Sequence, residues 1–448
     1  MNDIHLAAFI NPSHLSHSHA SWRHPRTATD FTDPAFYERI AQVLERGKFD
    51  LLFLGDCLSV PTRFGGSIAE TVGHGTQAAA MLDPTIVASN VAAVTKNLGL
   101  AATASTSYFS PYDLARRFST LDHMSQGRIG WNVVTSVSQS DARNFGLDAQ
   151  LAHDTRYDRA DEFLEVAYKL WGSWGEDALI LDQAAGKFAN ADLVHPIDHE
   201  GEWFKVKGPL SSPHSPQSRP VILQAGSSGR GREYAARWAE VVFAVNPSAA
   251  GRKSFYDDIK TRVSNYDRNP DGTKILMAFI PFVGETEEQA RESYEFHNQF
   301  ADPIDGLITL SNQLDHDFSA YSFDEPIADI KVEGVQGMFN LVQSLSKEQN
   351  LTLRDVGRLY AETQLIPTLI GTPTQIADQI EDLVRAGEAD GIMLSAGTTP
   401  GTFEDFVDLV VPELQRRGVF RKEYKSSTLR GHLGLGPASL DPVAKPQA

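Results

Sequence analysis

Eight short apolar runs, separated by segments of helical character, constrain the fold of this chain more than any other feature. Most of the runs are continuously apolar rather than alternating, which is typical of parallel strands covered on both faces. Strands that alternate with helices in this way favour a TIM-like (β/α)8 barrel of the α/β class over an open doubly wound sheet. The runs are residues 5–10, 50–56, 99–106, 128–136, 221–226, 240–246, 274–284 and 390–395.

Two of the intervening segments carry distinct helix signals. Residues 157–171 repeat apolar side chains at the spacing of one helix face. Further along, Thr372 can cap a helix that begins at Pro373, and Gln375 completes a capping box. Gly387 stands where that helix should end. We therefore expect an amphipathic helix in each place.

The length of 448 residues is compatible with a single barrel domain over residues 1–448, because barrels with insertions reach this size. Residues 174–219 and 301–366 are too long for ordinary connections, so each is interpreted as an insertion that shapes the pocket. The tail at about 420–448 is polar and then rich in Pro, Gly and Ala. It is expected to wrap or fray rather than to form a domain.

The charge balance bears on the class of partner. With 58 acidic and 40 basic residues the net charge is −18, which argues against nucleic acid or an anionic membrane as partner. The single cysteine, Cys57, excludes an intramolecular disulfide, and no run is apolar for long enough to span a bilayer. The first residues lack the features of a secretory leader, so a cytoplasmic protein that handles a small molecule is expected.

Polar residues follow four of the predicted strands, at the barrel end where catalytic residues lie in this fold. Asp or Ser after a strand often does no more than cap the next helix. Four such ends that meet at one rim are harder to explain by capping alone, and we interpret them as a site. They are Asp56, Thr103 to Thr106, Asn132 to Ser136, and Gly226-Ser227-Ser228.

The last of these ends passes through Gly and Ser into a segment that carries Arg230 and Arg232. A helix that begins there offers unpaired N–H groups and a favourable dipole, which suit a phosphate. The glycines at 226, 229 and 231 do not form the G-x-G-x-x-G pattern, so a dinucleotide site is not indicated.

Four histidines after the first run, in HLSHSHASWRH, raise the possibility of a metal centre. The H-x-H of His17 and His19 resembles the opening of metal-dependent amidohydrolases, whose zinc needs further ligands from later strands. Those strands end in QAGSS, AVNPS and LSAGT, without His or Asp. No metal site is predicted.

Several longer motifs, in this order, resemble the bacterial luciferase-like flavin monooxygenases, specifically the nitrilotriacetate and dibenzothiophene-sulfone monooxygenase group. The resemblance covers nearly the whole chain. The motifs are GRIGWNVVTS, ARNFG, HDTRYDRADEFLEVAYKLW, GEWFKVKGPL, PVILQAGSS, GTPTQIADQIEDL and VVPELQRRGVFRKEYKSSTLRGHLGL.

This resemblance implies a luciferase-like barrel that uses O2 and reduced FMN (FMNH2), supplied by a separate NAD(P)H:flavin reductase. It also implies a homo-oligomer, either a dimer or a tetramer. The resemblance assigns Ser227, Ser228 and Tyr157 to the phosphate, while Trp131 is expected to pack in the barrel layers. The positions implied around FMN are Asp56, Thr103, Asn132, Ser136, His153, Tyr157, Gly226, Ser227 and Ser228.

The substrate is less constrained. The runs KNLGLAATAST and HSHASWRH most resemble the sulfone-oxidising branch, which cleaves a C–S bond, whereas the amine and polycarboxylate branch cleaves C–N. A relative that oxidises long-chain alkanes carries His where this chain has Val137, which argues against the same pocket. His17 and His19 are the candidates for the substrate side. A deazaflavin-dependent oxidoreductase on the same barrel and an H-x-H metal hydrolase remain alternatives, and the sequence does not name the substrate or the reductase.

Overall fold

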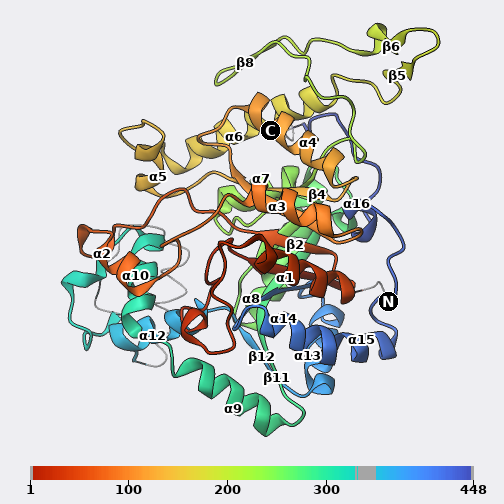
Figure 1. Ribbon diagram of the computed structural model, residues 1–448. Helices are drawn as coiled ribbons and strands as arrows, with labels where there is room; N and C mark the ends of the chain where they lie inside the picture. Colours follow the sequence, from red (N-terminus) through yellow and green to blue (C-terminus); the bar gives the residue numbers. More distant parts are fainter. Residues whose placement is uncertain (1–3, 328–329, 331–349, 445–448) are drawn as a thin grey trace.

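The computed structural model describes residues 4–327, 330 and 350–444 (Figure 1). Its centre is a closed barrel of eight parallel strands in the order β10-β9-β4-β3-β2-β1-β13-β11, and β11 pairs back with β10. All eight predicted strands are therefore confirmed, each within a few residues of its expected bounds. They are β1 (His5–Ile10), β2 (Leu51–Leu54), β3 (Gly99–Ser105), β4 (Ile129–Val134), β9 (Val221–Gln224), β10 (Val241–Ala244), β11 (Lys274–Val283) and β13 (Gly391–Ser395).

One further parallel strand was not predicted. β12 (Thr368–Gly371) pairs with the second half of β11, from Ile280 to Val283, beyond the part of β11 that closes the barrel. β11 is long enough to serve both functions, because it pairs with β10 and β13 through its first half.

Helices cover the outside of the barrel (Figure 1). Four of them begin at a proline that follows a capping side chain, Asp33, Asp83, Ser110 or Thr372, because proline suits the first helical position. The predicted capping box of Thr372 and Gln375 is also present. The covering helices are α1 (Pro34–Arg46), α3 (Pro84–Val94), α4 (Pro111–Met124), α6 (His153–Trp171), α7 (Gly229–Trp238), α8 (Ala249–Asn265), α9 (Glu287–Asn298), α13 (Pro373–Arg385), α14 (Gly401–Asp405) and α15 (Val411–Arg417).

The alternation of side chains along β4 separates packing from function. Trp131 points outward and packs against Phe118 of α4 and Phe163 of α6, and its indole N–H donates to the carbonyl of Ala104. The expected packing role is confirmed, but the ring lies between the strands and the helices rather than inside the barrel. Asn132, the next residue along, has the opposite orientation.

The described parts of the insertion at 301–366, residues 301–327 and 350–366, lie at the carboxyl ends of the strands, and residues 328–329 and 331–349 of it lie outside the described residues. The insertion contains α10 (Pro303–Leu314) and α12 (Leu353–Thr363), which pack on each other around a small core of their own. The loop after β1 is bonded to this insertion, because the N–H of His19 donates to the carbonyl of Ala361 and the Gln364 amide donates to the carbonyl of His17. The short helices α2 (Ala69–His74) and α5 (Gln139–Asn144) lie on the same side of the barrel.

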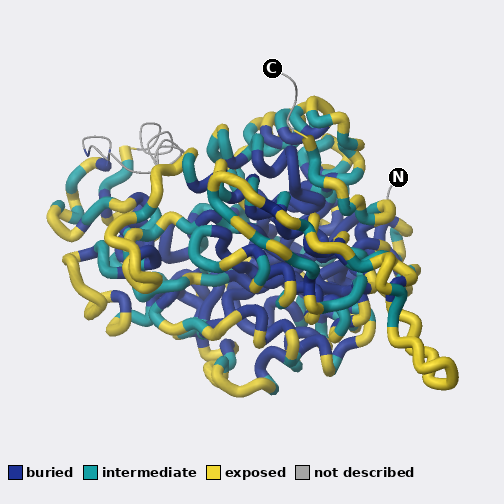
Figure 2. Tube along the Cα trace, turned by 90° about the horizontal axis from the view of Figure 1, so that it is seen from above, coloured by how far each residue is buried: buried dark blue, intermediate teal, exposed yellow. Residues whose placement is uncertain are grey.

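The insertion at 174–219 does not shape the pocket, so that expectation is wrong. It joins the end of α6 to the start of β9, and such a connection lies at the amino ends of the strands. One hairpin, β7 (His199–Glu200) with β8 (Lys205–Val206), lies along α6, where Glu162 accepts bonds from the backbone N–H groups of Trp203 and Phe204. The other, β5 (Leu179–Asp182) with β6 (Lys187–Ala189), projects away from the body (Figures 1 and 2).

The described part of the tail, residues 420–444, lies against the amino end of the barrel. Its short helix α16 (Leu429–His432) inserts Leu429 and Leu433 into the core inside the strands. Next to it, the carboxylate of Glu240 pairs with the guanidinium groups of Arg219 and Arg430, each at 2.7 Å. Among the described residues, no helix is both long and apolar enough to cross a membrane.

Candidate active site

Three stacked aromatic rings form an apolar floor at the carboxyl end of the barrel. Phe9 of β1 lies 5.1 Å from Phe53 of β2 and 5.8 Å from Phe243 of β10, measured between ring centroids. The three side chains belong to the core inside the strands. This floor was not predicted from the sequence. Side chains alternate between the two faces of a strand, so the position of each ring relative to the polar residue at the end of its strand indicates which way the ring faces.

Two pairs of polar side chains stand at the ends of β3 and β4. The Asn132 amide donates to the hydroxyl of Thr103 at 2.9 Å, and Thr103 donates to the carbonyl of Leu54 at 2.8 Å. Ser136, held in a left-handed conformation with φ of 49°, donates to Ser105 at 2.8 Å. The Oδ1 atom of Asn132 is buried and has no hydrogen-bond partner within the described chain. This buried acceptor can therefore receive a hydrogen bond from a bound group or a water.

The turn after β9 forms a helix N-terminus. Ser228 caps α7, and its hydroxyl accepts a bond from the N–H of Gly231 at 3.0 Å. Gly226 donates to the side chain of Gln224 at 2.7 Å, which fixes the turn. The N–H groups at the first helical positions, Gly229 and Arg230, have no acceptor among the described residues. This arrangement suits an anion.

A second helix begins at the same place. His153 is the first residue of α6, and its Nε2 atom lies 3.2 Å from the Ser228 hydroxyl. The ring of Tyr157, one turn further along, packs edge-to-face against His153 with 5.2 Å between ring centroids. Two helix N-termini, a hydroxyl, an imidazole and a phenol therefore meet, and their dipoles both favour negative charge.

The space between these groups is closely defined. A methyl group built on Gly231 would lie 2.8 Å from the phenol oxygen of Tyr157 and 3.0 Å from the Ser228 hydroxyl. One on Gly226 would lie 2.3 Å from the Gln224 amide. Any side chain at these two glycines would fill the cradle or push apart the groups that form it.

The two arginines of α7 do not enter this cradle. Arg230 pairs with Asp158 at 3.0 Å and with Asp161 at 2.8 Å, and Arg232 pairs with Asp258 at 3.1 Å. Their charge is balanced by carboxylates of neighbouring helices. The affinity for an anion therefore does not come from these two arginines.

Asp56 stands at the end of β2 in an acidic environment. Burial and, secondarily, the carboxylates of Asp83 and Asp141 raise its pKa to about 7. Asp141, on α5, accepts a bond from Ser59 at 2.5 Å, and burial raises its pKa as well. Asp56 therefore exchanges a proton near neutral pH.

The two histidines assigned to the substrate side lie in different surroundings. His17 lies on the floor, 4.4 Å from the Phe9 ring, and its Nδ1 is 2.5 Å from the Ser395 hydroxyl at the end of β13. His19 is completely buried and bonds to Thr309 of α10 at 2.7 Å. Burial lowers the pKa of His17 to about 4 and, together with nearby histidines, that of His19 to about 3. Both rings are neutral at physiological pH.

The site as a whole combines an apolar floor, polar strand ends and an anion cradle. This is the donor set that a flavin mononucleotide requires: a flat apolar surface, a few edge hydrogen bonds and a phosphate site. The cradle at Gly231 and the unpartnered Asn132 oxygen fit such a group. Within residues 4–327, 330 and 350–444 no cluster of three His, Cys, Asp or Glu side chains is arranged to hold a metal ion.

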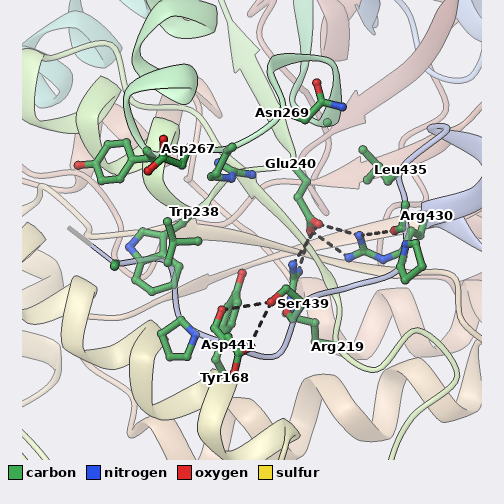
Figure 3. Close-up of a pocket in the computed structure, with 18 of the residues that line it drawn as sticks. Tyr168, Arg219, Trp238, Glu240, Asp267, Asn269, Arg430, Leu435, Ser439 and Asp441 are labelled. Atoms are coloured by element: carbon green, nitrogen blue, oxygen red, sulfur yellow. Dashed lines mark hydrogen bonds and ion pairs between the residues drawn. The ribbon is translucent and has the colours of Figure 1, made fainter. Parts of the chain in front are cut away.

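A cavity of about 910 Å³ lies at the opposite, amino end of the barrel (Figure 3). The tail forms one wall of it, and the Arg219–Glu240–Arg430 ion pairs form another. Its charged walls already bond to one another, and none of the predicted site residues lines it. We therefore assign the active site to the carboxyl end.

Comparison with known proteins agrees with this geometry. Residues 13–390 match the model of the family described as luciferase-like monooxygenase. The chain is 47% identical over 437 residues to a dibenzothiophene-sulfone monooxygenase of Rhodococcus erythropolis (strain XP), covering 96% of both chains. It is 40% identical over 436 residues to nitrilotriacetate monooxygenase component A of Aminobacter aminovorans, again with 96% of both covered.

Two solved structures have the same fold throughout. DmoA from Hyphomicrobium sulfonivorans superposes with a TM-score of 0.92 at 38% identity, covering 99% of this chain and 95% of that one. A riboflavin lyase, solved with modified FMN and riboflavin, superposes with a TM-score of 0.87 at 32% identity, covering 99% and 98%.

Proposed function

The chain belongs to the luciferase-like monooxygenase family and is a monooxygenase, and on that premise we propose that it is the oxygenase of a two-component system. It takes reduced FMN and O2 and oxidises a small organic sulfur compound of the sulfone type with cleavage of a C–S bond. The observation that carries the proposal is the anion cradle at the paired N-termini of α6 and α7, beside the apolar floor.

The residues for the cofactor follow from this arrangement. Ser227, Ser228, His153 and Tyr157 hold the phosphate, with N–H groups from the turn at Gly226. Asn132, Thr103, Ser136 and Asp56 line the ring. When bound, reduced FMN supplies the two electrons with which one atom of O2 is reduced to water while the other enters the substrate. The FMN-containing riboflavin lyase of the same fold supports this cofactor.

The protein side chains have three tasks in this scheme. The Phe9, Phe53 and Phe243 floor excludes water from one side of the site. The free Oδ1 atom of the Asn132 amide accepts a hydrogen bond from a donor on the bound group and so fixes the orientation of that group. His17, oriented by Ser395, presents its second ring nitrogen to the substrate.

The electrostatics of the substrate side favour an uncharged substrate. His17 and His19 are neutral at physiological pH, and their side-chain partners, Ser395 and Thr309, carry no charge. A polycarboxylate would need cations to replace its hydration. A sulfone offers two neutral acceptor oxygens and an apolar body, which suit an imidazole above an aromatic floor.

Two alternatives are retained. C–N cleavage of an amine or polycarboxylate has support from the similarity to nitrilotriacetate monooxygenase component A. Hydride transfer to a deazaflavin on the same barrel would consume no oxygen.

The reductase is proposed to be a separate protein, because the described chain offers one anion turn and no strand–G-x-G-x-x-G–helix unit. We also propose that the enzyme works in the cytoplasm.

The test is oxygen-dependent turnover. The purified chain is supplied with reduced FMN and offered aromatic sulfones, thioethers and aminopolycarboxylates in parallel, with oxygen uptake and products followed together. We expect a sulfinate from a sulfone. Turnover of the amines alone would replace C–S by C–N cleavage, and turnover without oxygen would favour the deazaflavin alternative.

A further inference from the structure

The loop that carries His17 is bonded to the insertion at 301–366 through one buried amide. Gln364 follows α12 in a left-handed conformation with φ of 50°, and its side chain is buried. Its Nε2 atom donates to the carbonyl oxygen of His17 at 2.9 Å, across 347 residues of sequence. In the described chain one other hydrogen bond reaches His17, between its Nδ1 atom and the Ser395 hydroxyl. Gln364 therefore fixes the backbone of this residue and Ser395 fixes its ring.

The amide of Gln364 belongs to a chain of three hydrogen bonds that runs through the insertion. Tyr360 of α12 donates its phenol proton to the Oε1 atom of Gln313 on α10. The Nε2 atom of Gln313 donates to the Oε1 atom of Gln364 at 3.1 Å, and Gln364 donates in turn to His17. The chain thus begins in the core that α10 and α12 share and ends at the residue that lies on the aromatic floor.

The direction of this chain is fixed from its last bond. A backbone carbonyl can only accept, so Gln364 must present its nitrogen to His17 and its oxygen to Gln313. Gln313 then has to present its nitrogen to Gln364 and its oxygen to Tyr360, whose phenol must donate. Burial raises the pKa of Tyr360, so the phenol keeps its proton. Each amide therefore has a single orientation, because a flip of either one breaks two bonds.

The following residues of the loop are attached to the same two helices. The N–H of His19 donates to the carbonyl of Ala361 on α12 at 2.9 Å, and the His19 ring bonds to Thr309 of α10 at 2.7 Å. These helices, which lie beside each other in Figure 1, pack around a core distinct from that of the barrel. His17 is therefore held by two bodies, with its ring bonded to the barrel at Ser395 and its backbone bonded to the insertion.

From these observations we propose that Gln364 is a positioning residue, which sets the height and direction of the His17 imidazole through the backbone of the loop. The inference rests on the proposed function, in which His17 faces the substrate. The ring lies 4.4 Å from the Phe9 ring, and Ser395 holds one of its nitrogens. A shift of the backbone therefore turns the second nitrogen away from the substrate. Groups in an active site have to be held to within about 0.5 Å of the productive geometry.

A purely structural role for this chain has different consequences. If the chain only stabilised the insertion, its loss would lower the unfolding temperature and would not act through the imidazole of His17. The anion cradle at Ser228 and His153 has no bond to Gln364, so FMN affinity should not depend on this amide. A positioning residue instead changes how much product is formed for each oxygen consumed.

The first measurement is independent of turnover. The rings of 15N-labelled histidines are observed by NMR, and the His17 signals are those missing from His17→Ala. Gln415→Met is the matched control, because the Gln415 amide donates to the carbonyl of Arg421 at 2.9 Å and lies on α15, outside the insertion. We expect Gln364→Met to shift the His17 signals, Tyr360→Phe to shift them less, and the control to leave them in place. Unchanged His17 signals in Gln364→Met would overturn the proposal, whatever reaction the enzyme performs.

The second measurement is the ratio of product to oxygen consumed, with chemically reduced FMN and a substrate that the wild type oxidises. Gln364→Met should lower this ratio about three- to tenfold, and Tyr360→Phe about twofold, because it acts from further along the chain. FMN affinity should be unchanged in both variants.

The decisive comparison is the double variant. Gln364→Met should lower the ratio no further in the His17→Ala background, because the imidazole through which it acts has been removed. Additive losses in the double variant, or an equal loss in Gln415→Met, would overturn the positioning role. If the wild type oxidises none of the offered substrates, the proposed function is contradicted, and the His17 signals alone decide whether Gln364 orients that ring.

Discussion

The hydroxyl oxygen of Ser228 lies 3.2 Å from Nε2 of His153 across the mouth of the barrel, although 75 residues separate the two in the sequence. Each residue stands at the N-terminus of a different helix. This contact locates the anion cradle and gives it a direct test.

Replacing Ser228 with Ala should weaken FMN binding about 10- to 100-fold, the value of a charge-assisted hydrogen bond. Because Ser228 also caps α7, some stability is lost as well. Ser248→Ala is the matched control, since Ser248 caps α8 with the same Ser-x-x-Gly geometry. It should lose stability and keep its FMN affinity. Equal fluorescence titrations for the two variants would remove Ser228 from the phosphate site.

His17→Ala should reduce product formed per flavin oxidised at least about tenfold, because the imidazole that faces the substrate is lost. FMN affinity should change little. His14→Ala is the control: it lies on the same loop but bonds to the carbonyl of Gly75 instead of reaching the floor. The measurement is the ratio of product to oxygen consumed, and normal coupling in His17→Ala would contradict the assignment.

Asp56 should make the stability of the flavin-free protein depend on pH. Its folded pKa of about 7 lies above the ordinary value of 3.8, so the folded state holds a proton that the unfolded state releases. The stabilisation is present below pH 4 and is lost as the pH rises towards 7. Asp56→Asn should remove that dependence and raise the free energy of unfolding at pH 8 by about 1–2 kcal/mol. Parallel urea titrations at pH 5 and pH 8 measure it, and equal pH slopes in the two proteins would contradict the shift.

The purified chain alone should not oxidise NADH or NADPH at a useful rate. Hydride transfer needs a second pyrophosphate site, and the single anion turn is assigned to FMN. Adding an unrelated flavin reductase with FMN should restore oxygen-dependent turnover. Absorbance of NADH is followed before and after the addition. Rapid, FMN-dependent loss of NADH by the chain alone is the outcome that contradicts a two-component system.

Glu240→Ala should lower the free energy of unfolding by about 3–5 kcal/mol, since it leaves two buried guanidinium groups without their carboxylate. Asp113→Ala, which breaks the exposed pair with Arg117, should have a much smaller effect. Urea denaturation compares the two. Similar losses would mean that the tail is not held by this ion pair.

Much of the fold could be predicted because its signals are local. Continuous apolar runs gave the eight strands, and the Thr372 capping box marked the start of α13. β12 was not predicted, because a strand of only four residues with partial burial resembles a loop in the sequence. The insertion at 174–219 was misjudged for a reason visible in the sequence: it follows a helix and precedes a strand, which assigns it to the amino end.

The candidate site was predictable only in part. Asn132, Thr103 and Ser228 stand out as polar residues at strand ends. The contact of His17 with Ser395 spans 378 residues, and the floor joins rings from β1, β2 and β10. Such contacts arise when the barrel closes, so no local pattern encodes them.

The closure of the barrel also sets an order of events during synthesis. His5 pairs with Gly391, and Leu429 and Leu433 fill the space inside the strands from below. A ribosome therefore releases the first strand and its neighbour β2 long before its second neighbour, β13, exists, and that edge of β1 stays unpaired until almost the whole chain has emerged. Contacts of such long sequence separation form slowly and expose apolar surface meanwhile. Nascent chains cut short before residue 390 should depend on chaperones, whereas the finished protein should not.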